Sequence, residues 1–148
     1  MEDRFKRFTV SITKIRRSIQ RIKAEEMAEY NLKSPHLSCL YYLYTEGTLT
    51  AKELCDICDE DKAAISRSIL QLEKEEYVVY RSEAKKRYRT PIELTEKGKR
   101  IAKSLVEKVE NVLAKVGADL TEKERIAFYA NLELISINLE KLCDSYDE

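Results

Sequence analysis

The chain has few of the residues that break helices and build turns. Only 3 glycines and 2 prolines occur in 148 residues, which argues against a many-turned β fold and favours long helices. It has no run of about 18 apolar residues, the length that a transmembrane helix requires. The charged segment at the N-terminus also lacks the apolar centre of a signal peptide. We therefore expect a cytoplasmic protein that does not enter a membrane.

Residues typical of enzymes and metal sites are scarce as well. His36 is the single histidine, which argues against a His-based catalytic triad and against a cluster of His metal ligands. The sequence contains no Gly-rich phosphate loop, no GxSxG elbow and no carboxylate pair placed for acid–base chemistry. We predict that the protein is not an enzyme and that it carries no metal and no cofactor.

Four cysteines, at positions 39, 55, 58 and 143, do not resemble the disulfide framework of a small secreted domain. Cys55 and Cys58 form a CxxC motif, but this motif supplies only two of the four ligands of a structural zinc site. On a helix both would share one face with Leu54, so we interpret them as small apolar core residues. A thiol-based redox-sensing regulator is the alternative interpretation.

Charges are balanced overall but unevenly distributed. The chain has 27 basic and 27 acidic residues, so composition alone gives no support for nucleic-acid binding. Residues 81–89, however, include five basic residues and one acid, a local net charge of +4. Residues 119–148 include eight acids and three bases, a local net charge of −5. This pattern is typical of a protein that contacts DNA with one face and its own partner with another.

Both ends of the chain read as amphipathic helices. Residues 4–30 carry a heptad-like apolar seam at steps of three and four, formed by Phe5, Phe8, Ile12, Ile15, Ile19 and Ile22. Thr95 is the predicted cap of a long helix that ends near Gly117 and turns Ile101, Leu105, Val109, Val112 and Val116 inward. A capping box at residues 121–124 opens a last apolar-faced helix. An N-terminal helix with such a seam needs a partner, either within the chain or from a second copy.

The middle of the chain predicts a winged helix-turn-helix. Ser34 is the predicted cap of one helix, with Pro35 in its first turn. Thr50 and Glu53 form the capping box of a short helix over 50–58, and a turn follows at Asp59. The next helix, over 61–76, has Ile65, Ile69 and Leu72 on one face. Two β-rich segments, at 77–80 and on the approach to Leu94, enclose the basic loop.

The predicted fold is mainly α with a small β-hairpin, in the order α-α-α-α-β-β-α-α. We expect one domain over 1–148, in which 34–98 is a winged helix DNA-binding lobe. Residues 1–33 and 99–148 would then be the dimerisation helices. A helix sized for the major groove beside a basic hairpin predicts double-stranded DNA as the partner.

The candidate DNA-binding residues follow from these two elements. On the helix over 61–76 they are the side chains that point away from its apolar face, and in the wing they are the cations that can neutralise phosphates: Lys62, Ala63, Ser66, Arg67, Gln71, Lys85, Lys86, Arg87 and Arg89. Two alternatives stay open. The helix face and the charge run are ordinary solvated surface, or the winged helix is a protein-interaction module that meets an acidic partner.

Two segments resemble the MarR family of bacterial transcription regulators (multiple antibiotic resistance regulators). Leu54 to Leu72 is similar to the family's helix-turn-recognition-helix, and Ile92-Glu93-Leu94-Thr95-Glu96-Lys97-Gly98 is similar to the signature after its wing. The resemblance implies an obligate homodimer in which each subunit reads half of a pseudo-palindromic operator. It also implies repression as the commonest mode, with release by a small ligand.

The resemblance has departures and open points. Lys86 stands where the family often has Asp, Asp59 where it usually has Gly, and Glu60 where it has an apolar residue. In some relatives a small aromatic or phenolic effector binds at the junction of the dimerisation helices and the DNA-binding lobe. By that likeness the candidate ligand-binding residues are His36, Tyr41, Tyr42, Tyr44 and Arg16. The alternative for the tyrosines is core packing with one polar end.

Overall fold

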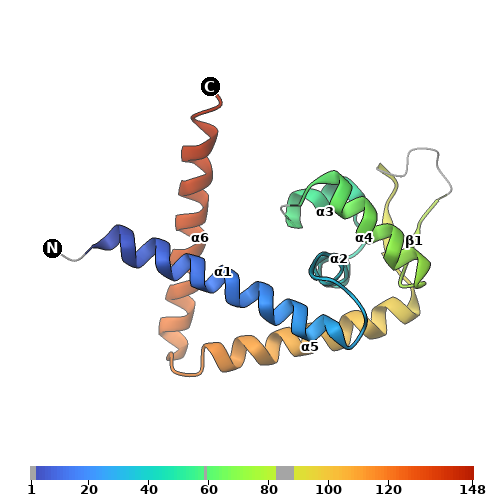
Figure 1. Cartoon of the computed structure of the whole chain (residues 1–148), viewed down its shortest axis with the longest axis horizontal. Helices are drawn as coiled ribbons and strands as arrows, with labels where there is room; N and C mark the ends of the chain where they lie inside the picture. Colours follow the sequence, from blue (N-terminus) through green and yellow to red (C-terminus); the bar gives the residue numbers. More distant parts are fainter. Residues whose placement is uncertain (1–2, 59, 83–88) are drawn as a thin grey trace. The chain divides into compact units, whose positions relative to one another are not determined.

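The computed structural model describes residues 3–58, 60–82 and 89–148 and confirms the predicted order of elements (Figure 1). The described residues form α1 (Arg4–Ala28), α2 (Ser34–Thr45), α3 (Ala51–Cys58), α4 (Lys62–Lys74), β1 (Val78–Tyr80), β2 (Ile92–Leu94), α5 (Glu96–Val116) and α6 (Glu122–Asp144). Within these residues no helix is both long and apolar enough to cross a membrane. The protein is therefore mainly helical with one small hairpin, as predicted.

The chain divides into two compact units, one up to Lys108 and one from Val109 onwards. The first unit holds the hydrophobic core, in which α2 packs against α1, α3, α4 and β2. Leu40, Leu54, Ile65 and Leu72 are completely buried there. The second unit consists of the end of α5, a turn after Gly117, and α6.

Side-chain caps define where the helices begin. The Thr50 hydroxyl accepts from the Glu53 amide at 3.1 Å, and the Glu53 carboxylate accepts from the Thr50 amide at 2.8 Å. The same reciprocal pair joins Thr121 and Glu124, at 3.2 and 2.8 Å. These interactions satisfy amides that have no partner inside the helix. Both predicted capping boxes are confirmed.

The hairpin is antiparallel and carries a third short pairing. Its register places Val78 opposite Leu94 and Tyr80 opposite Ile92. Leu49, in the segment before α3, also exchanges two backbone hydrogen bonds with Ile92, at 3.1 and 2.7 Å. Ile92 is completely buried, so this pairing fixes β2 to the segment before α3.

The start of α5 lies directly against the turn between α4 and β1. The Thr95 hydroxyl accepts from the Gly98 amide at 2.9 Å and donates to the Glu76 carbonyl at 2.6 Å. A Cβ atom at Gly98 would lie 1.9 Å from the carbonyl oxygen of Tyr77. Only glycine permits this approach of two backbones. Thr95 was predicted as the cap of this helix, and the structure confirms it.

His36 fastens the N-terminus of α2. The helix already begins at Ser34, so the predicted cap at Ser34 is wrong by one residue, and Lys33 occupies the cap position. The Nδ1 atom of His36 accepts from the Lys33 amide at 2.8 Å. Burial, together with the nearby charge of Lys33, lowers the pKa of His36 below its ordinary value. The neutral imidazole is therefore the form that the fold requires.

We expect Gly98→Ala to destabilise the first unit. The added methyl group would overlap the Tyr77 carbonyl, and the backbone shift it forces should cost about 1–3 kcal/mol. Urea unfolding followed by circular dichroism measures the change. Gly117→Ala is the matched control, because its Cβ would meet only ordinary contacts, the nearest at 3.4 Å. Equal stability of Gly98→Ala and the unaltered protein would contradict the close approach.

His36 should make the stability of the fold depend on pH. Its pKa is lower in the folded state than in the unfolded chain, where it is about 6.5. The unfolded chain thus binds the proton more readily, and the free energy of unfolding should fall as the pH drops below that value. His36→Asn keeps an acceptor for the Lys33 amide but cannot titrate. The thermal midpoint of this variant should fall less between pH 7 and 5, and an equal fall would refute the assignment.

Candidate nucleic-acid interface

The buried face of α4 fixes how this helix is rotated. Ile65 and Leu72 are completely buried and Ile69 is 2% exposed, so the predicted apolar stripe faces the core. Ser68 lies on the same side, where its hydroxyl donates to the Ala64 carbonyl at 2.9 Å. The Asp61 carboxylate caps the helix by accepting from the Ala64 amide at 2.7 Å. The opposite face of α4 must therefore point away from the core.

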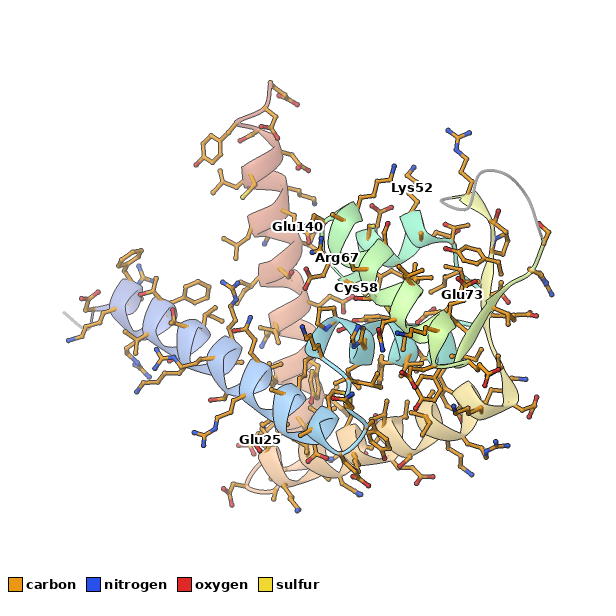
Figure 2. The ribbon with its side chains drawn as sticks, turned by 45° about the vertical axis from the view of Figure 1, so that its right-hand side comes forward. Glu25, Lys52, Cys58, Arg67, Glu73 and Glu140 are labelled. Carbon is orange, nitrogen blue, oxygen red and sulfur yellow. The ribbon has the colours of Figure 1, made fainter. Side chains whose placement is uncertain are left out.

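The predicted recognition residues of α4 lie on this outward side. Lys62, Ala63, Ser66 and Arg67 are all exposed, and Figure 2 labels Arg67 on this helix. Gln71 is half-buried at the edge of the face, and its amide donates to the Glu75 carboxylate at 3.2 Å. The structure thus brings four of the five predicted residues together on one accessible surface, which we call the outward face of α4.

Two further residues of this face were missed by the sequence analysis. Leu70 is 62% exposed and Lys74 is exposed as well. Leu70 comes four residues after Ser66 and three after Arg67, a spacing that places side chains on one face of a helix. The helical spacing of Leu70 from Ser66 and Arg67 is visible in the sequence, but the predicted contact residues did not include large apolar side chains.

A polar hollow of about 510 Å³ lies beside the outward face, at the start of α2. Its lining includes two cations, Lys33 and Arg67, together with Asn31, His36 and Gln71. Lys33 lies before α2 and Arg67 lies on α4, so positive charge from two separate segments borders the same hollow. Such a surface suits an anion such as a phosphate group.

Most of the wing prediction lies outside the described residues. This applies to Lys85, Lys86 and Arg87, and to the turn residue Asp59. Arg89 is described and is exposed. Arg81, the residue after β1, forms an ion pair with Glu93 of β2 at 3.7 Å between exposed side chains. Glu60, which replaces an apolar residue of the MarR pattern, is exposed.

The candidate ligand-binding residues are spread over the first unit. Tyr41 and Tyr42 form an edge-to-face pair with ring centroids 5.3 Å apart, and Tyr42 packs against the core. Burial raises the pKa of Tyr42. His36 lines the hollow beside α4, whereas Tyr44 lines a different hollow of about 500 Å³. Arg16 is exposed on α1. His36 and Tyr44 therefore do not share one pocket.

The cysteines take different positions. Cys39 is completely buried in α2, and Cys58, at the end of α3, is half-buried and packs against the core. A hydrogen bond from Cys39, together with the charge of Lys23, lowers the pKa of the Cys58 thiol, and the same hydrogen bond raises the pKa of Cys39. Cys143 is exposed on α6. Among the described residues no three His, Cys, Asp or Glu side chains are grouped as metal ligands.

Comparison with known proteins identifies the family. A family model described as a winged helix DNA-binding domain matches residues 36–113, just over half of the chain. A search of curated proteins by sequence finds no significant match. Many solved structures share the fold.

Three of these structures cover nearly the whole chain. A MarR transcriptional regulator from Methanosarcina mazei Go1 is 22% identical, with a TM-score of 0.79, over 96% of this chain and 94% of that one. A MarR protein from Peptoclostridium difficile DA00132 is 19% identical, with a TM-score of 0.80, over 95% and 92%. S. aureus MepR, solved in complex with DNA, is 17% identical, with a TM-score of 0.75, over 89% and 96%. The chain therefore belongs to the winged helix DNA-binding domain family, and its fold is that of the MarR regulators that its motifs resemble.

Proposed function

We propose that the protein is a sequence-specific transcriptional regulator that binds double-stranded DNA as a homodimer. The observation that carries this proposal is the outward face of α4, where Lys62, Ser66 and Arg67 are exposed opposite a fully buried stripe. A helix held in this way can enter the major groove and present its side chains to base edges. Among proteins of the same fold, MepR has been solved in complex with DNA.

Arg67 is the residue to which we assign most of the base recognition. A guanidinium group can donate two hydrogen bonds to the O6 and N7 atoms of guanine, which is worth roughly 1–3 kcal/mol of discrimination. The cations of the wing, Lys85, Lys86, Arg87 and Arg89, would neutralise phosphates and release counterions. Contacts to base edges then give the selectivity. Contacts to phosphates position the protein on the duplex and give most of the salt dependence of binding.

Homodimerisation is supported by the apolar side chains that the single chain leaves exposed. All six residues of the α1 seam are between 37% and 77% exposed. The last helix, α6, exposes an even larger set: Ile126, Phe128, Tyr129, Leu132, Leu134, Ile135, Ile137, Leu139 and Leu142. Contiguous apolar surface of this extent marks an interface in a globular protein. We assign both helices to a dimer layer, with 34–98 as the DNA-binding lobe.

Two such lobes, related by a two-fold axis, would read the halves of a pseudo-palindromic operator. The half-sites should lie about one helical turn apart, because each α4 needs its own major groove on one side of the duplex. A dimer on a promoter blocks polymerase, so we propose repression in the cytoplasm. A small ligand could release the DNA only if it binds the DNA-incompetent form of the dimer more tightly.

A second property, oxidant sensing, is favoured by one specific observation. The thiols of Cys39 and Cys58 are hydrogen-bonded partners on α2 and α3, and α3 is the first helix of the helix-turn-helix. We propose that the Cys58 thiolate attacks the terminal oxygen of a hydroperoxide. An S–O bond forms as the O–O bond breaks, so Cys58 becomes a sulfenic acid and the rest of the hydroperoxide leaves as an alcohol or water. Cys39 then displaces water from this sulfur, and a disulfide forms.

The main proposal is tested with duplex fragments from around the gene that encodes the protein. We expect tight, salt-sensitive and fragment-selective binding in a gel shift, and a dimer in a sizing run alongside. Arg67→Ala should weaken selective binding by about 10-fold or more, the effect of losing a good base contact. Arg100→Ala, an exposed arginine of α5, is the matched control. A folded monomer, or unchanged selectivity of Arg67→Ala, would overturn the respective assignment.

The oxidant proposal is tested with hydrogen peroxide. DNA binding by the unaltered protein should fall after treatment and recover after reduction, and Cys58→Ser should stay bound, because it lacks the attacking thiolate. Cys143→Ser, which changes an exposed cysteine outside the pair, should respond like the unaltered protein. Equal loss of binding by Cys58→Ser would contradict the role of this pair.

A further inference from the structure

Leu70 is a large apolar side chain on the outward face of α4. It is 62% exposed, whereas the apolar side chains one residue before and two residues after it, Ile69 and Leu72, are buried. Leu70 therefore contributes little to the core of the subunit. Ser66 stands one helical turn before it, also exposed. The two side chains border the same small hollow, of about 270 Å³.

This hollow is not built for a phosphate. Its lining includes the apolar residues Ala51, Ile69 and Leu70, together with Tyr80. The two charged groups that also line it, Lys62 and Glu73, have opposite signs, so the site offers no net positive charge to an anion. It differs in this from the hollow on the other side of α4, which is bordered by Lys33 and Arg67. We therefore expect this hollow to take a neutral group in which a hydrogen-bonding atom lies next to an apolar one.

Thymine presents such a pair of atoms in the major groove. Its O4 atom is a hydrogen-bond acceptor, and the C5-methyl group lies next to it. A hydroxyl and a leucine four residues apart lie on one face of a helix, about 5–6 Å between their Cβ atoms. The Ser66 hydroxyl can donate to O4 while Leu70 covers the methyl group. Cytosine offers a donor in place of O4 and has no methyl group, so it would lose the contact with Leu70.

We propose that Ser66 and Leu70 form a thymine-specific subsite on the outward face of α4. The proposal rests on the proposed function, because it requires α4 to enter a major groove. It assigns T·A recognition to one position in each half-site, separate from the guanine contact assigned to Arg67.

The test removes a single methyl group from the DNA. A duplex is first selected from a random pool with the unaltered dimer, and each thymine of its half-site is then replaced by deoxyuridine, one at a time. At one position the replacement should raise Kd about fourfold, the effect of leaving one methyl group's contact unmade. Leu70→Ala should bind the thymine duplex and the deoxyuridine duplex with equal Kd. Both Kd values should be higher than that of the unaltered protein for the thymine duplex.

A matched variant separates this contact from a general loss of apolar surface. Ile57→Ala removes another exposed apolar side chain, on α3, and should keep the fourfold preference for thymine. The thermal midpoint of Leu70→Ala should stay close to that of the unaltered protein, because Leu70 is 62% exposed, and circular dichroism should show that Ile57→Ala is folded. The subsite is refuted if Leu70→Ala keeps the preference or if no position prefers thymine. Failure to enrich any duplex from the pool would instead refute the proposed function.

Discussion

The burial of one face of α4 is the constraint on which the rest of the structure depends. Ile65, Ile69 and Leu72 cannot leave the core without exposing apolar surface, each at a cost of about 1.5–3 kcal/mol. Because their position is fixed, the rotation of α4 is fixed too, and with it the identity of the outward face. Arg67 and Leu70 are accessible for this reason, and the sequence of the helix interior thus decides which side chains can meet DNA.

Backbone contacts, rather than ion pairs, hold the elements around α4 together. Gly98 lets the start of α5 touch the Tyr77 carbonyl, and Thr95 donates to the Glu76 carbonyl in the turn between α4 and β1. Lys108 pairs with Glu26 and Glu29 at 3.5 and 2.7 Å, but these are partly exposed ion pairs that contribute little to stability. Backbone contacts thus place the hairpin beside α4, whereas the Lys108 ion pairs join α5 to the end of α1.

Local patterns made much of the fold predictable. The capping boxes at Thr50 and Thr121 and the 3.6-residue period of α4 gave most helix starts within one residue, because they depend on neighbours in sequence. Val116, which was expected to face inward, is 73% exposed in the single chain, since a helical pattern does not tell which partner covers it.

Contacts between residues far apart in the sequence could not be predicted from local patterns. The hydrogen bond of Cys39 with Cys58 joins residues of two helices, so no local motif could indicate it. Cys55 and Cys58 both pack against the core, as their shared helix face predicted. The candidate ligand residues were chosen by resemblance, and His36 and Tyr44 border different hollows. Leu70 was overlooked for a chemical reason: an exposed leucine is common, and it becomes informative only on the face of a helix that reads DNA.

The central claim is that two copies of α4, held at a fixed rotation, read two adjacent major grooves. Selection of duplexes from a random pool by the unaltered protein, followed by sequencing, tests it most directly. We predict enrichment of an inverted repeat whose half-site centres lie about 10–10.5 base pairs apart, or a whole multiple of that spacing. Enrichment of a single unrepeated site, or no enrichment by a folded dimer, would contradict the account.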